Sequence, residues 1–439
     1  MKTWQLIVVG ILLAGNQWVV AEQATNGESI LERDQVTGEW MGTRPVLCDC
    51  GIQIFGGYTM EVWGNTTGGI KTGSVYSGLM NFGAEVDLEK TAGWKGASVK
   101  TTWLWLSGRD PSADLVGNFL AVSNIAGFNT LRMFELWFQQ NLLDDKISLR
   151  AGQLAADSEF IISDYGGLFI NGTFGWPASA SMNMPSGGPG YPVGGLGARL
   201  ALNPVDWFTF QSAVFQGNVF AQDVNRHGFR WRLDAETGYT FLNEAQFRWN
   251  HRDEETWLPG QFKAGAWFQT GASADALAEN TDSGNAGYYA ILDQMLFREP
   301  GEPECCGKDG KDFKAPVRVT KSDQGLGWFG RVSFAPADRN FISFYFDSGF
   351  NYKGLIPTRD NDTVGIGFGY AGLSNGARNS LAADGSSPTG AEMVIEFTYQ
   401  AQITRWLVVQ PDLQYIINPG GANDLSNAFV VGGRASVTF

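Results

Sequence analysis

Charged, amide and indole side chains alternate with apolar ones along two neighbouring stretches of the chain. Glu135, Trp137 and Gln139 take every second position of the first stretch, and Arg150 takes the equivalent face of the second. Carboxylates accept hydrogen bonds, arginine donates them and amides do both, while an indole offers an apolar face. This set suits a neutral polyol, which has hydroxyls at its rim and C–H groups on its faces.

These residues belong to a predicted β-hairpin with strands at 131–141 and 146–155 and a turn at Asp144-Asp145. Pairing across the turn places Gln139 opposite Arg150. The apolar residues of both strands then share one face, an agreement that the turn alone need not produce. That outward face holds Phe134, Leu136, Phe138, Leu142, Ile147, Leu149 and Ala151.

The same period-two pattern runs from Gly51 to the chain end and predicts about sixteen strands. Between residues 286 and 361, the links between strands are hard to assign to the periplasmic or the outer side of the membrane. The link 297–325 is long where a short periplasmic turn is expected, so a pair of strands could be misplaced there. The last strand ends on Phe439 with no tail. Strands of about ten residues and an even strand number are typical of outer-membrane barrels. The predicted fold is therefore all-β: a transmembrane, antiparallel, up-and-down β-barrel.

The link 156–195 is about forty residues long and rich in aromatic residues. Loops of this size are usually functional. Folding the loop into the lumen would bury its aromatic side chains and narrow the pore. The predicted constriction residues are Phe169, Asn171, Phe174 and Trp176.

Three segments are expected from the order of the chain. Residues 1–21 have the pattern of a secretory signal peptide, 22–50 form a periplasmic segment with a short helix, and 51–439 form the barrel. With 57 Gly, 13% aromatic and 17% charged residues, the composition favours a barrel of the bacterial outer membrane. The net charge of −14 argues against nucleic acid as a partner.

Strand parity places polar and indole residues of both charge signs inside the barrel. A ring of one sign would select an ion, whereas mixed signs suit a neutral polyol. The predicted pore-lining residues are Glu61, Glu85, Lys100, Glu135, Trp137, Gln139, Arg150, Arg199, Lys263, Trp267, Arg331, Glu396, Asp412 and Gln414. Parity also places Asp87, Asp347 and Glu392 inside.

A structural alternative exists for every member of this set. An Arg–Glu pair would hold the wall round, with Trp137 packed under the 156–195 loop. A solvated pore wall with no other role is likewise the alternative for the residues near the end of the chain, Glu392, Glu396, Asp412 and Gln414.

Catalysis has little support in the sequence. Facing carboxylates such as Glu396 and Asp412 suit glycoside hydrolysis, but that reaction needs a closed cleft. His227 and His251 fall in links, away from any nucleophile in a strand, so we expect no catalytic residues and no enzyme.

Metal and cofactor binding are not expected either. The pairs Cys48/Cys50 and Cys305-Cys306 are spaced too tightly for a usual zinc site. Export favours surface disulfides, whose connectivity the sequence leaves open.

Three motifs stand out: Thr37-Gly38-Glu39-Trp40 with Arg44, Leu149-Arg150-Ala151-Gly152-Gln153, and the run from Gln410 to Gly420, which is the most specific. With them, the chain resembles the OprB family of carbohydrate-selective porins over nearly the whole mature chain. Met41, where a second Gly is usual, and the cysteine pairs depart from the family.

The resemblance implies a sixteen-strand outer-membrane barrel that passes glucose and other small sugars by diffusion. Expected partners are such sugars, outer-membrane lipid and lipopolysaccharide, and the barrel-assembly machinery through Phe439; the protein would be a monomer or a homotrimer. The alternatives are a general diffusion porin and a secreted soluble β-protein, such as a lectin or glycosidase. Inward aromatic residues and mixed charge favour the sugar-selective channel.

Overall fold

The computed structural model describes residues 29–233, 236–251, 257–274, 281–301 and 322–439. Their sixteen strands form one closed antiparallel barrel in which sequence neighbours pair and β1 pairs with β16. The strands are β1 (Ile52–Thr67), β2 (Gly73–Asp87), β3 (Ala97–Gly108), β4 (Thr130–Leu142), β5 (Ile147–Leu154), β6 (Gly195–Val205), β7 (Phe208–Gln216), β8 (Tyr239–Trp249), β9 (Gly260–Ala274), β10 (Thr281–Arg298), β11 (Gly325–Phe334), β12 (Ile342–Lys353), β13 (Thr363–Leu373), β14 (Ala391–Thr404), β15 (Leu407–Ile417) and β16 (Ala428–Thr438).

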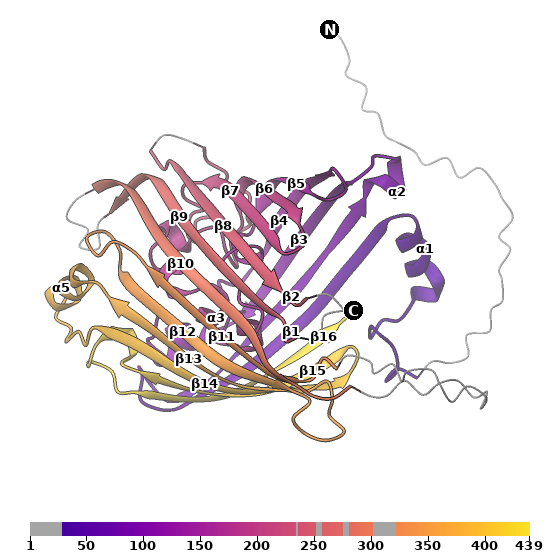
Figure 1. Cartoon of the computed structure of the whole chain (residues 1–439). Helices are drawn as coiled ribbons and strands as arrows, with labels where there is room; N and C mark the ends of the chain where they lie inside the picture. Colours follow the sequence, from indigo (N-terminus) through magenta and orange to yellow (C-terminus); the bar gives the residue numbers. More distant parts are fainter. Residues whose placement is uncertain (1–28, 234–235, 252–256, 275–280, 302–321) are drawn as a thin grey trace, which may run out of the picture.

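Short α-helices lie in the links and in the N-terminal segment. They are α1 (Thr43–Asp49), α2 (Leu88–Ala92), α3 (Gly172–Gly175), α4 (Ala178–Ser181) and α5 (Asn375–Ala383). Helix α1 and the C-terminus lie at one end of the barrel, and α5 lies at the other (Figure 1). None of the helices in the described part of the chain is long and apolar enough to span a bilayer.

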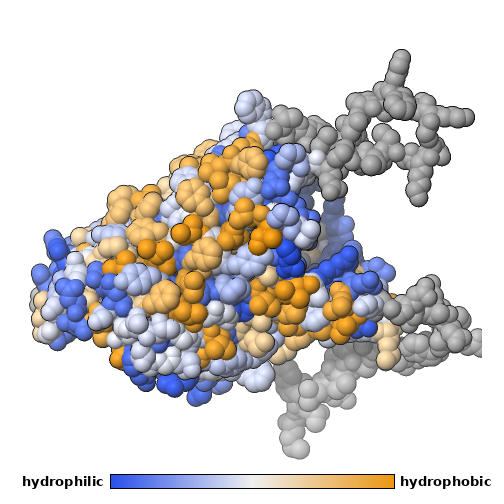
Figure 2. All heavy atoms as spheres, turned by 90° about the horizontal axis from the view of Figure 1, so that it is seen from below, coloured by the Kyte–Doolittle hydropathy of each residue, from blue (hydrophilic) through white to orange (hydrophobic). Residues whose placement is uncertain are grey.

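Alternating side chains explain why the wall is a barrel. On β1, Val62 is 58% exposed on the outside, whereas Glu61 and Trp63 are fully buried inside. Figure 2, which views the molecule from below, shows hydrophobic residues over much of the outer wall. An apolar exterior with a polar interior is what lipid outside and water inside require.

The predicted hairpin is confirmed in its register. Gln139 pairs with Arg150 across a turn in which Leu143, Asp144 and Asp145 have φ angles of 53°, 51° and 63°. Asp tolerates this left-handed conformation better than most residues. One detail differs: the β3–β4 register shifts beside Phe134, and its ring lies 6.1 Å from that of Tyr191 in the 155–194 loop. A bulge breaks the strict alternation that placed Phe134 outward.

The predicted strands between 286 and 361 are also confirmed. The link between β10 and β11 is long, yet β10, β11 and β12 pair in order, so no strand is misplaced. The expected disulfides are not seen at Cys48 and Cys50, which are free and exposed, while Cys305 and Cys306 lie outside the described residues. No cluster of His, Cys, Asp or Glu suited to a metal occurs in the part that the structure describes.

The N-terminal segment holds the seam where the barrel closes. The Phe439 N–H donates to the Gly56 carbonyl on β1 (3.0 Å), and the Val36 N–H donates to the Thr438 carbonyl (3.0 Å). Arg44 Nη1 donates to the Phe439 main-chain oxygen (3.3 Å), and its guanidinium lies 4.2 Å from the Trp40 ring centroid. The proposed signal peptide, 1–21, lies outside the described residues.

Candidate functional site

The link between β5 and β6, residues 155–194, lies inside the barrel, and we call it the inward loop. Phe169 and Phe174 are buried and pack together with Phe329 of β11, with ring centroids 5.7 and 6.1 Å from that of Phe329. Phe160 and Ile161 belong to a second buried apolar cluster, which also contains Trp137 and Trp267. The inward-folded loop predicted from its aromatic residues is therefore confirmed.

Wall carboxylates bind main-chain N–H groups of the inward loop. Glu396 on β14 accepts from Ile170 N (2.6 Å) and Asn171 N (2.9 Å). Glu244 on β8 accepts from Ile161 N (3.0 Å). Hydrogen bonds of this kind to a charged acceptor are stronger than those between neutral groups.

Wall cations bind carbonyl groups of the same loop. Arg331 on β11 donates to the carbonyls of Ile161 (2.8 Å), Thr173 (2.8 Å), Phe174 (3.1 Å) and Gly175 (3.3 Å). It is also ion-paired with Asp347, its neighbour on β12, and both are fully buried. On β9, the Lys263 ammonium donates to the Ile162 carbonyl (2.7 Å). These charges satisfy loop backbone that would otherwise be buried without partners.

The β15 residues extend this attachment. Gln414 accepts from the Asn171 side-chain amide (3.0 Å) and donates to the Val122 carbonyl (2.9 Å) and to Asp412 (3.1 Å). Asn171 also caps α3 by accepting from Thr173 N (3.1 Å). Thus Asn171 and Gln414, both predicted from sequence, meet across the lumen.

A charged cluster joins the inward loop to β4, β5 and β6. Arg150 and Arg199 pair in the β5–β6 register, and both form ion pairs with Glu159 of the loop, Arg199 Nε at 2.6 Å. Gln139 accepts from Arg150 Nε (2.9 Å) and Arg199 Nη2 (3.3 Å). Three predicted residues therefore meet, but their shared carboxylate, Glu159, comes from the loop.

Trp137 lies beneath this cluster and beneath the loop. Its ring is 4% exposed, and the Arg150 guanidinium lies 4.0 Å from the ring centroid. This position matches the structural alternative in which Trp137 packs under the loop. Trp267 is buried in the same apolar cluster.

Lys100 and Glu85 lie opposite each other on β3 and β2 and are partly exposed. Lys100 Nζ lies 5.2 Å from the Phe55 ring centroid and 5.9 Å from that of Trp137. Glu135, buried on β4, accepts from the Thr102 hydroxyl (3.3 Å). Glu61 accepts from Arg434, from Ser123 Oγ (2.5 Å) and from the Trp63 indole (2.8 Å).

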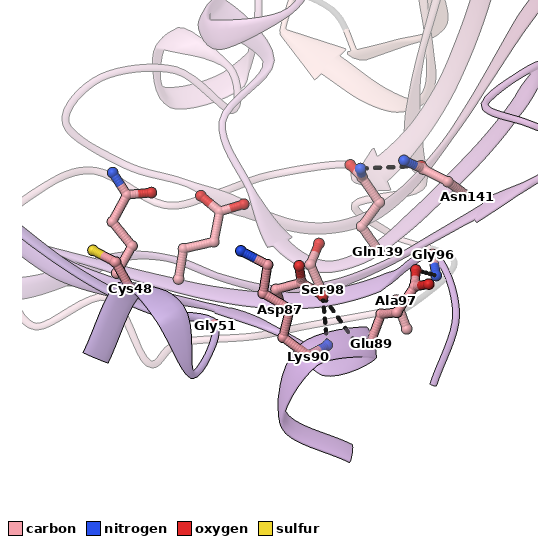
Figure 3. A pocket seen from close by; sticks show the side chains of 12 residues that line it. Cys48, Gly51, Asp87, Glu89, Lys90, Gly96, Ala97, Ser98, Gln139 and Asn141 are labelled. Carbon is pink, nitrogen blue, oxygen red and sulfur yellow. Dashed lines mark hydrogen bonds between the residues drawn. The ribbon is translucent and has the colours of Figure 1, made fainter. Parts of the chain in front are cut away.

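Two cavities open onto the β1–β4 side of the lumen. The first cavity lies at the α1 end of the barrel, and we call it the periplasmic cavity after the orientation expected from the sequence. Its volume is about 590 Å³, and the residues that line it include Gln53, Glu85, Ser98, Gln139 and Asn141. Figure 3 shows Gln139 bonded to Asn141 on one side of this cavity, with Asp87, Lys90 and Cys48 across from them.

The extracellular cavity, of about 480 Å³, lies at the other end, among residues that include Leu79, Asp157, Trp176 and Tyr191. Leu79 and Glu85, one in each cavity, are six residues apart on β2, about 20 Å along the strand. The inward residues between them, Asn81 and Gly83, are partly exposed. We call this row of inward β2 residues, Leu79, Asn81, Gly83 and Glu85, the lane.

Comparison with known proteins identifies the barrel. The family model described as "Carbohydrate-selective porin, OprB family" matches residues 71–439. The chain belongs to the OprB family of carbohydrate-selective porins. It is a sugar-selective channel of the bacterial outer membrane.

Relatives agree with this membership. Porin B of Pseudomonas aeruginosa is 25% identical over 92% of this chain and 90% of its own length. A putative porin, QuiX, of Acinetobacter baylyi is 20% identical over 98% of both chains. A solved structure of Pseudomonas putida OprB at high pH has a TM-score of 0.78 and 24% identity, covering 94% of this chain and all of that one, and it supports the OprB-like fold.

Several residues that shape this porin's lumen were not among the predicted site residues. Glu159, Asp157 and Tyr191 are in the inward loop, where no alternation indicates direction. Arg434 and Phe55, in contrast, have inward parity on β16 and β1. If alternation had been applied to every residue of the two strands that pair at Glu61, both residues would have been predicted to face the lumen.

Proposed function

We propose that small, glucose-like sugars cross the barrel passively along the lane beside β2. In this proposal Lys100, Glu85, Gln139 and Arg150 are the wall residues that exchange hydrogen bonds with the moving sugar. Their mixed charges supply donors and acceptors without favouring either ion sign.

The observation that carries the proposal is the division of the inward polar residues between two tasks. Glu396, Arg331, Lys263 and Gln414 bind the inward loop, whereas Lys100 and Glu85 keep partial exposure beside the lane. Within the described residues, Lys100 forms contacts with two aromatic rings, and no ion pair of its ammonium is found. Its N–H donors are therefore open to a ligand.

The same division supports a channel rather than an enzyme. Glu396 and Asp412 would be the pair for glycoside hydrolysis, yet Glu396 already binds two loop amides and Asp412 binds Gln414. Both carboxyl groups are also buried, so neither is open to a substrate in the lumen.

Sugar block of ion current tests the proposal. We expect Lys100→Met and Arg150→Ala each to weaken glucose block by roughly tenfold, because a hydrogen bond to a charged group contributes about 1.5–3 kcal/mol. Both variants should also make the channel more cation-selective, as judged by reversal potential. Lys95→Met, on the exposed periplasmic turn, is the matched control and should change neither. Unaltered glucose block in both wall variants would refute the lane.

A further inference from the structure

The extracellular cavity has a lining unlike the rest of the lumen. It lies between the inward loop, the loop 109–129 and β2, and it is bounded by the rings of Phe119, Trp176 and Tyr191. Two carboxylates, Asp110 and Asp157, also line it. Among the described residues, no lysine or arginine does so, in contrast to the arginine cluster at Glu159.

Arg434 and Arg132 are absent from this lining and have contacts elsewhere. Arg434 forms an ion pair with Glu61 and also donates to Asn124, which does line the cavity. Arg132 is buried on β4; its Nη2 donates to the Asn225 carbonyl (3.0 Å), whereas its Nε and Nη1 have no hydrogen-bond partner among the described residues. The aspartates are therefore the charged groups at the cavity surface itself.

Trp176 is fixed in a position suited to stacking. Its indole N–H donates to the Gly187 carbonyl (2.8 Å), and a side chain at Gly190 would begin 3.3 Å from the ring, so this backbone packs closely on it. The C–H face of a sugar ring packs well on such a rigid aromatic surface.

Asp157 is incompletely satisfied. One carboxylate oxygen accepts from the Tyr191 N–H (2.7 Å), and the other has no hydrogen-bond partner among the described residues. Burial raises the pKa of Asp157 to about 6; the Glu135 carboxylate facing it from β4 adds to this rise, and the Tyr191 N–H opposes it. Burial also raises the pKa of Asp110. A bound cation would relieve the cost of both buried charges.

We infer that the extracellular cavity is a binding subsite for sugars that carry a protonated amino group, with Trp176 as the stacking surface and the carboxylates of Asp110 and Asp157, which both line the cavity, as the acidic groups that attract the ammonium. The inference rests on the proposed function, because it requires sugars to enter this lumen. A volume of about 480 Å³ falls within the usual range for small-molecule sites. An acidic sugar would meet two carboxylates here and would be disfavoured.

Block by three matched sugars tests this subsite: D-glucosamine, D-glucose and D-glucuronate, each titrated at pH 7 in single-channel recordings of the whole porin. We expect glucosamine to block at roughly tenfold lower concentration than glucose, and glucuronate more weakly than either. The double variant Asp110→Asn/Asp157→Asn should reduce glucosamine block to the level of glucose. Asp384→Asn is the control, since Asp384 is exposed at the end of α5 and is not among the residues that line the cavity.

A change of pH supplies an independent test. The glucosamine ammonium is protonated at both pH 7 and pH 5, whereas Asp157 becomes neutral as the pH falls through about 6. The excess of glucosamine block over glucose block should therefore shrink at pH 5 in the natural protein. In Asp110→Asn/Asp157→Asn this pH-dependent part should be absent.

The outcomes separate this inference from the proposed function. Glucose block without a glucosamine excess, or an excess that survives in the double variant, would overturn the subsite alone. If none of the three sugars blocks the current, the proposed function fails and the subsite fails with it.

Discussion

Arg331 shows what a buried charge does in this lumen. Its guanidinium is shared between Asp347 and four loop carbonyls, so its donors are used by groups that would otherwise lose hydrogen bonds to water. Removing one partner of such a buried pair typically costs about 3–5 kcal/mol, because the other charge is left unpaired. The charge of Arg331 therefore holds the loop and is not available to a passing sugar.

Two adjacent residues in the middle of β1 can test which side chains of the wall face lipid and which face the lumen. Met60 is 42% exposed on the lipid side, and Thr59 lies on the lumen side opposite Leu79. Arginine on the lipid face near the midplane costs roughly 2–4 kcal/mol, whereas the lumen hydrates it. We expect Met60→Arg to reduce the yield of folded barrel far more than Thr59→Arg. Heat-modified migration in SDS gels measures this, and equal yields would contradict the assigned faces.

At the scale of elements, the inward loop behaves as a second layer packed on the inside of the barrel. Its aromatic side chains bury against β11 and β9, while its backbone binds charged residues of β8, β9, β11 and β14. A loop without a regular hydrogen-bonding partner needs such side-chain partners when it is buried. The barrel wall thus fixes the width of the lane through the loop.

Loss of one loop attachment is expected to widen the channel. Glu396→Ala removes the acceptor for Ile170 N and Asn171 N, and a protein hydrogen bond contributes about 0.5–1.5 kcal/mol. Because Arg331 and Lys263 still hold the loop, we expect higher and noisier single-channel conductance in a barrel that still folds. Glu299→Ala is the control, since Glu299 accepts from Tyr352 in the link after β10. Conductance equal to that of the control would show that Glu396 does not restrain the loop.

Over the whole molecule, the features that could be predicted from the sequence are those that contact with the bilayer requires, namely the strands, their faces and their pairing. A bilayer forces every second wall residue to be apolar, so the sixteen strands and the Gln139–Arg150 pairing follow from period-two patterns. The partners of Glu396 and Lys263 do not follow, because loop N–H and carbonyl groups have no signature in the sequence. Parity placed Trp137 inside correctly, but only the folded loop shows that it is covered.

Closure of the barrel depends on one seam, β1 against β16, and the N-terminal segment covers the end of this seam at which the C-terminus lies. Arg44 is buried there, with contacts to the Phe439 main-chain oxygen, to Thr37 Oγ1 (3.1 Å) and to the Trp40 ring. The Thr37–Arg44 motif therefore has a structural role at the seam, far from the lane. Its position is suited to resisting separation of the first and last strands.

We expect Arg44→Ala to weaken the seam by about 1–3 kcal/mol, since it removes two hydrogen bonds and a cation–π contact from a buried position. Arg405→Ala provides the contrast. Arg405 lies in the turn between β14 and β15 and pairs with Asp34 of the N-terminal segment (2.9 Å) at an exposed site, where ion pairs contribute about 0–1 kcal/mol. The temperature at which the folded band disappears in SDS gels should fall clearly for Arg44→Ala and little for Arg405→Ala. Sugar block of the surviving barrels should be unchanged in both, because neither residue borders the lane. If both variants melt like the natural protein, strand pairing alone holds the seam, and the N-terminal segment only rests against it.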